Sequence, residues 1–220
     1  SNIVRTERNP QHLNIALLRY AVHTLSFDEA SPLQKKWALA ASGMLAKSVS
    51  VELLATKDLR VDWLAEQRGM GLTICPGRRD RGREIDDDLA SLKEDEVKLL
   101  VGSMTKAEMA RLAVAQLPQK CAEVGIRYLH VPIVDQGVPT EEAMKAAVAE
   151  IADAVEKGHK VVFHCLGGLG RSGTVAACTL VQLGLKPEDA INAVRQARGP
   201  RAIESKKQEQ FVYDFGSQTS

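Results

Sequence analysis

Residues 164–173 read His-Cys-Leu-Gly-Gly-Leu-Gly-Arg-Ser-Gly and directly follow the apolar run Val161-Val162-Phe163. The run predicts a buried strand, and the sequence after the glycines predicts a helix. A glycine-rich loop in this position can turn several backbone N–H groups towards one anion, and the helix dipole adds to their positive field. The phosphate-binding residues expected from this stretch are Leu166, Gly167, Gly168, Leu169, Gly170 and Arg171.

The same stretch carries a candidate nucleophile and a candidate phosphate clamp. Cys165 stands at the base of the loop, where inward N–H groups and the helix dipole favour its thiolate form. The planar guanidinium of Arg171 can hold two phosphate oxygens at once. These groups supply positive potential without a metal ion, and the five histidines and four cysteines show no spacing typical of a metal site. We therefore expect no metal and no cofactor.

The order Cys165, Arg171, Ser172 resembles the signature of the cysteine-dependent protein tyrosine phosphatases. The glycine-rich filling and the preceding histidine resemble the dual-specificity branch, and within it the kinase-associated phosphatases of the cyclin-dependent-kinase inhibitor type and their bacterial relatives. The resemblance extends over residues 59–215 and includes segments 71–77, 132–139 and 198–204. It implies a protein phosphatase that forms a phosphocysteine intermediate and hydrolyses phosphotyrosine, with phosphoserine and phosphothreonine as further substrates.

The resemblance also gives roles to three further residues. Asp135 lies in a loop bounded by Pro132 and Pro139 and would protonate the leaving oxygen, although aspartate is also common in ordinary turns. Ser172 would hydrogen-bond the sulfur as the phosphocysteine breaks down, and it would also serve as an ordinary helix N-terminal serine, since both roles can hold together. His164 would support the loop, and the alternative is a histidine satisfied within the core.

The remaining pattern alternates strands and helices. A capping box of Thr105 with Glu108 opens one helix, and Thr140, Arg171 and Pro187 begin others. Such alternation predicts an α/β fold with a mostly parallel central sheet flanked by helices, as in dual-specificity phosphatases. Ligands bind such sheets at the carboxyl ends of the strands. The expected strands are residues 59–64, 70–75, 97–101, 126–131 and 160–164.

The chain divides into two parts at about residue 55. Residues 1–55 lie outside the resemblance and predict a helical N-terminal extension, with helices within 11–27 and 32–54. Residues 56–220 form the expected phosphatase domain. A packed extension is the simplest interpretation, and dimerisation or partner binding are alternatives. The sequence does not predict the oligomeric state.

The net charge and the distribution of cysteines bear on which partners the protein binds and on where it is located. A net charge of +1 over 220 residues gives no general reason to expect nucleic-acid or membrane binding. No apolar run approaches the roughly 20 residues of a membrane span. Scattered cysteines are typical of reduced thiols in a cytoplasmic protein. The family resemblance, and not the composition, implies a phosphoprotein substrate as the partner, with a kinase among the candidates.

Several alternatives stay open at this point. Residues 166–170 contain no lysine, which disfavours highly charged phosphoinositides. A catalytically weak phosphate-binding interaction module, a phosphatase of a small-molecule phosphate and a sulfurtransferase are the rival functions. Arg83, in the basic segment 78–83, is a candidate substrate contact or a solvated surface residue. Cys75 is either a buried apolar residue or a partner for a disulfide with Cys165 under oxidation.

Overall fold

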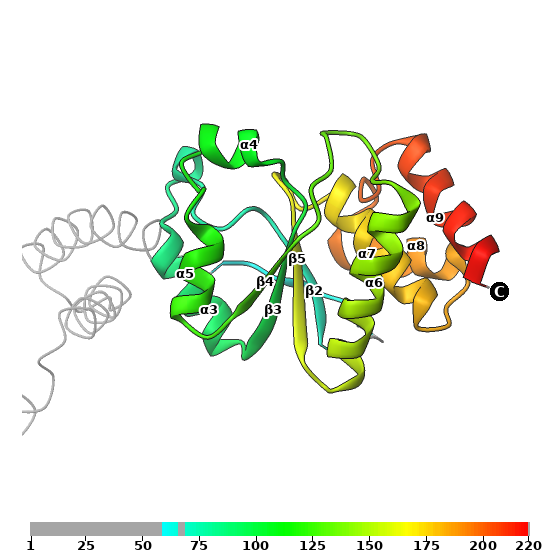
Figure 1. The fold of residues 1–220 in the computed structure, drawn as a ribbon, viewed down its shortest axis with the longest axis horizontal. Coiled ribbons are helices and arrows are strands. Elements are labelled where there is room, and N and C mark those ends of the chain that lie inside the picture. The colour runs from blue at the N-terminus through cyan, green and yellow to red at the C-terminus, as the bar shows by residue number, and fades with distance from the viewer. Residues whose placement is uncertain (1–58, 66–68, 220) are drawn as a thin grey trace, which may run out of the picture. The chain divides into compact units, whose positions relative to one another are not determined.

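The computed structural model describes residues 59–65 and 69–219 of the chain (Figure 1). The helices expected within residues 1–55, and the proposed division at that point, lie outside the described residues.

The described part contains a five-stranded sheet. Its strands are β1 (Asp62–Trp63), β2 (Met70–Thr73), β3 (Val97–Gly102), β4 (Arg127–His130) and β5 (Lys160–His164). Their spatial order is β1-β2-β5-β3-β4. The last four pair in parallel, and β1 pairs with β2 in antiparallel fashion at one edge. The predicted mostly parallel α/β fold is confirmed, although the strand expected at 59–64 shortens to the two residues of β1.

Helices cover both faces of the sheet. Figure 1 shows α3, α4 and α5 on one side and α6 to α9 on the other. The expected helix starts at Thr105, Thr140 and Pro187 are observed, and the helix expected from Arg171 begins one residue earlier. The helices are α3 (Ile85–Glu94), α4 (Lys106–Arg111), α5 (Leu117–Glu123), α6 (Glu141–Glu156), α7 (Gly170–Gln182), α8 (Pro187–Arg198) and α9 (Lys206–Thr219), with a 3-10 turn at Arg79–Arg81.

The central strand β5 is buried on both faces. Val161 and Phe163 pack in the core beneath α6 to α9, whereas Val162 packs in the core beneath α3 to α5. Both neighbours of β5 are parallel to it, so the chain must leave all three strands at the same edge of the sheet. Cys165 follows β5 at that edge, and the loop carrying Asp135 follows β4 there. The fold thereby brings together residues far apart in the sequence.

A close backbone approach at the end of β3 requires a glycine. A Cβ atom at Gly102 would overlap the hydroxyl of Tyr128 and lie 2.7 Å from Nε2 of His164. The Tyr128 hydroxyl itself lies 3.2 Å from that nitrogen. The absence of a side chain at this position therefore allows the Tyr128–His164 contact to form directly before Cys165.

We predict that Gly102→Ala lowers the free energy of unfolding by about 1–3 kcal/mol, because the new methyl group overpacks this contact. The Tyr128→Phe change removes the overlapping oxygen, so the double variant should lose less than the sum of the two single variants. Chemical denaturation of the four proteins measures this coupling. Strictly additive losses would show that the Tyr128 hydroxyl is not what the added methyl group meets.

Candidate active site

The loop of residues 165–170 is shaped by its glycines. Gly168 adopts a left-handed conformation with φ of 67°, and a Cβ atom there would overlap the Thr73 carbonyl oxygen and lie 3.0 Å from the Ile74 nitrogen. The loop thus packs directly against the backbone at the end of β2. Leu169 caps α7, whose first residue is Gly170. The helix axis therefore starts at the loop, and its positive end faces the loop residues.

Cys165 lies at the base of this loop and is 3% exposed. The hydroxyl of Ser172, in the first turn of α7, donates a hydrogen bond to Cys165 Sγ at 3.4 Å. Ser172 is itself fully buried. The two side chains that the sequence placed seven positions apart therefore touch, with a hydroxyl proton directed at the sulfur.

Arg171 contacts several segments of the site through its guanidinium group. Its side chain is 2% exposed. Nη1 donates to both carboxylate oxygens of Glu108 at 2.9 Å and to the Ile133 carbonyl at 3.1 Å. Nη2 lies 3.0 Å from Oδ1 of Asp135. One guanidinium thus joins the catalytic loop to the segments that follow β3 and β4.

Glu108 has two functions that the sequence shows only in part. It forms the predicted capping box of α4, in which its carboxylate accepts from the Thr105 N–H at 2.9 Å and the Thr105 hydroxyl at 2.8 Å. The same carboxylate binds Arg171. Burial alone raises the pKa of Glu108, but the hydrogen bonds from Thr105 and the charge of Arg171 together hold that pKa below its ordinary value. Glu108 is therefore an anion at neutral pH and neutralises a buried cation.

Asp135 lies on an exposed but anchored loop. Its side chain is 63% exposed, and the preceding Val134 accepts a turn hydrogen bond from Gly137 at 2.8 Å. The buried Gln208 of α9 donates from Nε2 to the Gly137 carbonyl at 3.1 Å. The carboxylate therefore reaches solvent on one side and Arg171 on the other, on a loop whose backbone is held by α9.

His164 contacts the first residue of the loop through its side chain. Its Nδ1 lies 3.3 Å from the Cys165 carbonyl oxygen, which can only accept, so Nδ1 must carry the proton. Nε2 is then free to accept from the Tyr128 hydroxyl at 3.2 Å. Burial lowers the pKa of His164 to about 4, so the ring is neutral at neutral pH.

The basic segment 78–83 reaches the site through Arg78. Arg78 Nη1 donates to the Leu166 carbonyl of the loop at 3.2 Å. Arg83, a candidate substrate contact or solvated surface residue from the sequence, directs its Nε to the buried carboxylate of Asp88 at 3.0 Å. This arginine therefore takes part in fixing the start of α3, because Asp88 also accepts from the Gly77 N–H at 2.7 Å.

The cysteines are all free thiols. Cys75 is fully buried, and burial raises its pKa to about 12. Its backbone N–H donates to the Leu166 carbonyl at 3.3 Å. Cys75 thus behaves as the buried residue of the simpler sequence interpretation while touching the catalytic loop through its backbone.

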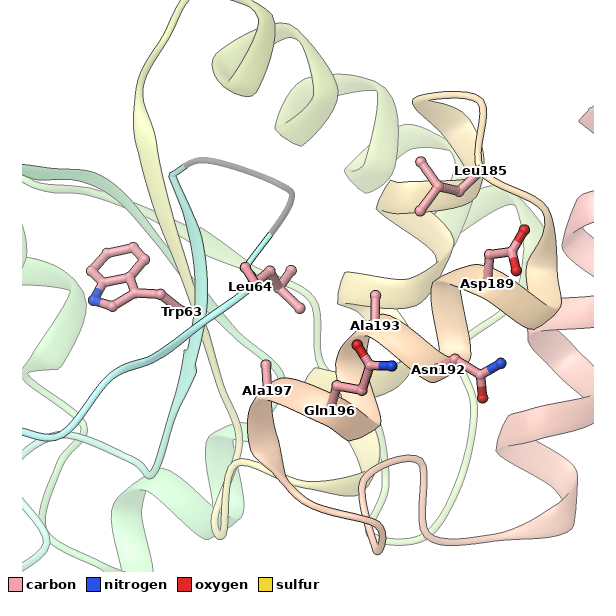
Figure 2. Close-up of a pocket in the computed structure, with 9 residues that line it drawn as sticks. Trp63, Leu64, Leu185, Asp189, Asn192, Ala193, Gln196 and Ala197 are labelled. Carbon is pink, nitrogen blue, oxygen red and sulfur yellow. The ribbon is translucent and has the colours of Figure 1, made fainter.

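A groove of about 700 Å³ lies away from these groups, between β1 and α8. Figure 2 shows Trp63 and Leu64 on one side of it and Ala193 and Gln196 on the other. Cys165, Arg171 and Asp135 do not line it.

In residues 59–65 and 69–219, no cluster of three or more metal-ligating side chains occurs. Within the same ranges, no helix is long and apolar enough to cross a bilayer.

Comparisons with known proteins identify the family of the chain. The family model described as "Polymorphic toxin system, DSP-PTPase phosphatase" matches residues 75–185. Cyclin-dependent kinase inhibitor 3 of Rattus norvegicus is 32% identical over 166 residues, which cover 71% of this chain and 78% of that protein. The Homo sapiens protein of the same name is 31% identical over the same shares.

Two solved structures are also similar to this chain. The structure of kinase associated phosphatase (KAP) with its catalytic site cysteine replaced by serine superposes with a TM-score of 0.68 at 30% identity, covering 74% of this chain and 96% of that chain. The active form of Tk-PTP superposes with a TM-score of 0.57 at 26% identity, covering 72% of this chain and 97% of that chain.

We predict that Glu108→Gln destabilises the protein by about 1–3 kcal/mol at neutral pH, because the buried Arg171 loses a charged partner. The folded-state pKa of Glu108 is lowered, so its contribution is complete at neutral pH and is lost as the pH falls below the ordinary range of a glutamate. Denaturation of wild type and variant from pH 7 to pH 3 should show the two curves converging in acid. A difference that stays constant with pH would contradict the ionic role of Glu108.

A second pH prediction concerns His164. Its folded-state pKa of about 4 lies below the ordinary histidine value of 6.5, so the unfolded chain binds the extra proton between these values. Stability from this residue is complete above pH 6.5 and is lost towards pH 4, with a maximum loss of about 3 kcal/mol. His164→Gln should flatten this part of the stability profile. A variant profile as steep as that of the wild type would assign the slope to other groups.

Proposed function

The chain belongs to the dual-specificity phosphatase family and is a cysteine-dependent protein phosphatase, and from this premise we propose that Cys165 is its nucleophile and Asp135 its general acid. The observation that carries the proposal is the contact of Arg171 with Asp135 on one side of the loop and of Ser172 with Cys165 on the other. The rival interpretation as a catalytically weak binding module is not favoured, because the matched relatives are phosphatases.

In the first step, the Cys165 thiolate attacks phosphorus in line with the leaving oxygen. The backbone N–H groups of Leu166, Gly167, Gly168, Leu169, Gly170 and Arg171 bind the three non-bridging oxygens. Asp135 gives its proton to the leaving oxygen, and the phosphoryl group is transferred to sulfur. Positioning and charge stabilisation supply most of the rate acceleration, as in other phosphoryl transfers.

The two terminal nitrogens of the Arg171 guanidinium, Nη1 and Nη2, have different roles. Nη1 is held by Glu108 and the Ile133 carbonyl, so the guanidinium plane is fixed before substrate arrives. Nη2 contacts Asp135 at 3.0 Å, and a substrate phosphate competes with Asp135 for this nitrogen. Binding of phosphate thereby releases the Asp135 carboxylate from Arg171. The freed carboxylate takes up a proton from the solvent that it faces, and gives this proton to the leaving oxygen.

In the second step, water hydrolyses the phosphocysteine. The Ser172 hydroxyl donates to sulfur and stabilises the returning thiolate, for which the 3.4 Å contact with Cys165 is suitable. Asp135, now deprotonated, accepts a proton from the attacking water. His164 touches neither substrate nor water in this scheme and holds the Cys165 carbonyl away from the phosphate.

For the substrate we propose a phosphoprotein carrying phosphotyrosine, with phosphoserine or phosphothreonine also accepted. The absence of lysine from residues 166–170 supports a monoester of modest charge. The names of the relatives, cyclin-dependent kinase inhibitor 3 and kinase associated phosphatase, support a phosphorylated kinase as the partner. A cytoplasmic location, a helical extension at residues 1–55 and a phosphatase domain at 56–220 complete the proposal.

We predict that the wild type hydrolyses p-nitrophenyl phosphate in the presence of chelator and reductant, while Cys165→Ser is inactive. Asp135→Asn should lower kcat by about 10²–10⁴-fold, because it removes the proton donor. Asp153→Asn, which alters an aspartate paired with Lys157 on α6, serves as the matched control and should keep wild-type kcat. Turnover that survives in Cys165→Ser, or that chelator abolishes, would contradict the mechanism.

A further inference from the structure

Three successive carbonyl groups of the catalytic loop are bound by arginines. The Gly167 carbonyl accepts from Arg198 Nη2 at 2.9 Å, and the Gly168 carbonyl accepts from Arg198 Nε at 2.9 Å. The Leu166 carbonyl accepts from Arg78 Nη1 at 3.2 Å. All three carbonyls therefore point out of the loop towards cations.

This arrangement determines where the neighbouring N–H groups point. In a trans peptide the C=O of one residue and the N–H of the next are directed to opposite sides of the chain. Holding the carbonyls of residues 166, 167 and 168 outward therefore turns the N–H groups of Gly167, Gly168 and Leu169 inward. A glycine-rich loop has little intrinsic preference for one orientation, because its peptide planes rotate at low cost. The arginines supply that preference.

Arg198 is itself fixed by a buried carboxylate. Its Nη1 lies 2.9 Å from Asp62 Oδ2, and the exposed fractions of the two side chains are 18% and 7%. Asp62 also accepts from Arg60 Nε at 2.7 Å through its other oxygen. Arg198 thus uses one nitrogen for orientation and two for the loop, which only a guanidinium fork can do.

The pair also connects the two elements on either side of the groove in Figure 2. Asp62 lies in β1, directly before Trp63, and Arg198 ends α8, directly after Ala197. Helix α8 is held in the core independently, through its buried residues Ala190, Ile191 and Val194. Loss of the Arg198 head group therefore affects the loop without removing the packing of the helix.

We propose that Arg198, oriented by Asp62, is a positioning residue that holds the 165–171 loop in its phosphate-binding conformation. This proposal rests on the proposed function, in which that loop binds the substrate phosphate. Arg78 performs the same task for the first carbonyl of the series, with Asp80 as its partner. Arg198 touches no reacting atom and acts only through the loop backbone.

The test compares Arg198→Lys with the wild type by two measurements that do not depend on turnover. The first is the affinity for orthovanadate, and the second is the pH midpoint of Cys165 alkylation by iodoacetamide, followed by peptide mass spectrometry. A lysine cannot reproduce three directed hydrogen bonds, so vanadate affinity should fall roughly tenfold or more. The alkylation midpoint should move to higher pH, because fewer N–H groups face the sulfur.

Arg127→Lys is the matched control. Arg127 forms an exposed ion pair with Glu150 at 2.9 Å at the start of β4, so its conservative replacement should change neither measurement. Asp62→Asn is a milder variant that keeps the loop contacts of Arg198 and should shift both readouts in the same direction by less. Adding it to Arg198→Lys should cause little further change, because the two residues act as one unit.

The possible results distinguish a failure of the Arg198 positioning role from a failure of the proposed function. A wild type that binds vanadate, together with Arg198→Lys and Asp62→Asn proteins that match it in both measurements, overturns the positioning role, even if their melting temperatures fall. A wild type that neither binds vanadate nor shows a reactive Cys165 overturns the proposed function itself. Should Arg198→Lys fail to fold, Asp62→Asn decides the positioning role by the same two readouts.

Discussion

The orientation of a few peptide groups in residues 165–170 is the constraint on which the rest of the molecule depends. An anion site made of backbone N–H groups works only if the carbonyls of the same loop point elsewhere and find partners there. Arg78 and Arg198 supply those partners. The glycines permit the conformation, and the buried strand β5 and helix α7 hold its two ends.

A second constraint is the burial of a permanent positive charge. Arg171 is almost completely enclosed, and an enclosed cation is costly unless it is paired and hydrogen-bonded. Glu108 and Asp135 meet this need in different ways. Glu108 is partly buried and accepts two hydrogen bonds from Thr105, so it is a fixed partner of Arg171. Asp135 is largely exposed, so it is the partner that a substrate phosphate can displace.

The sequence predicts best those structural features that are caused by residues close together in the chain. The glycine-rich loop, the capping box at Thr105 and the apolar run before Cys165 each have a local physical cause, and each feature is present in the structure. The sequence pattern does not predict helix α3, because the buried Asp88 interrupts its apolar face. That aspartate makes sense only with its tertiary partners Gly77 and Arg83.

The supporting contacts of the site were also beyond the sequence. Glu108 was visible as a cap, but its bond to Arg171 joins residues 63 positions apart. Its place just after β3, at the same edge of the sheet as Cys165, was the signal that could have found it. No comparable signal marked the pairing of Arg198 with Asp62, which are 136 positions apart and on different elements. Local pattern predicts the reacting groups, whereas tertiary contact determines their orientation.

The most direct test of this account is to trap the covalent intermediate. Wild-type protein would be mixed rapidly with p-nitrophenyl phosphate, quenched in acid and mapped by mass spectrometry of its peptides. We expect one phosphoryl group on the peptide containing Cys165, attached to sulfur and formed as fast as p-nitrophenol is released. Rapid turnover with the phosphoryl group on another residue, or on none, would contradict it.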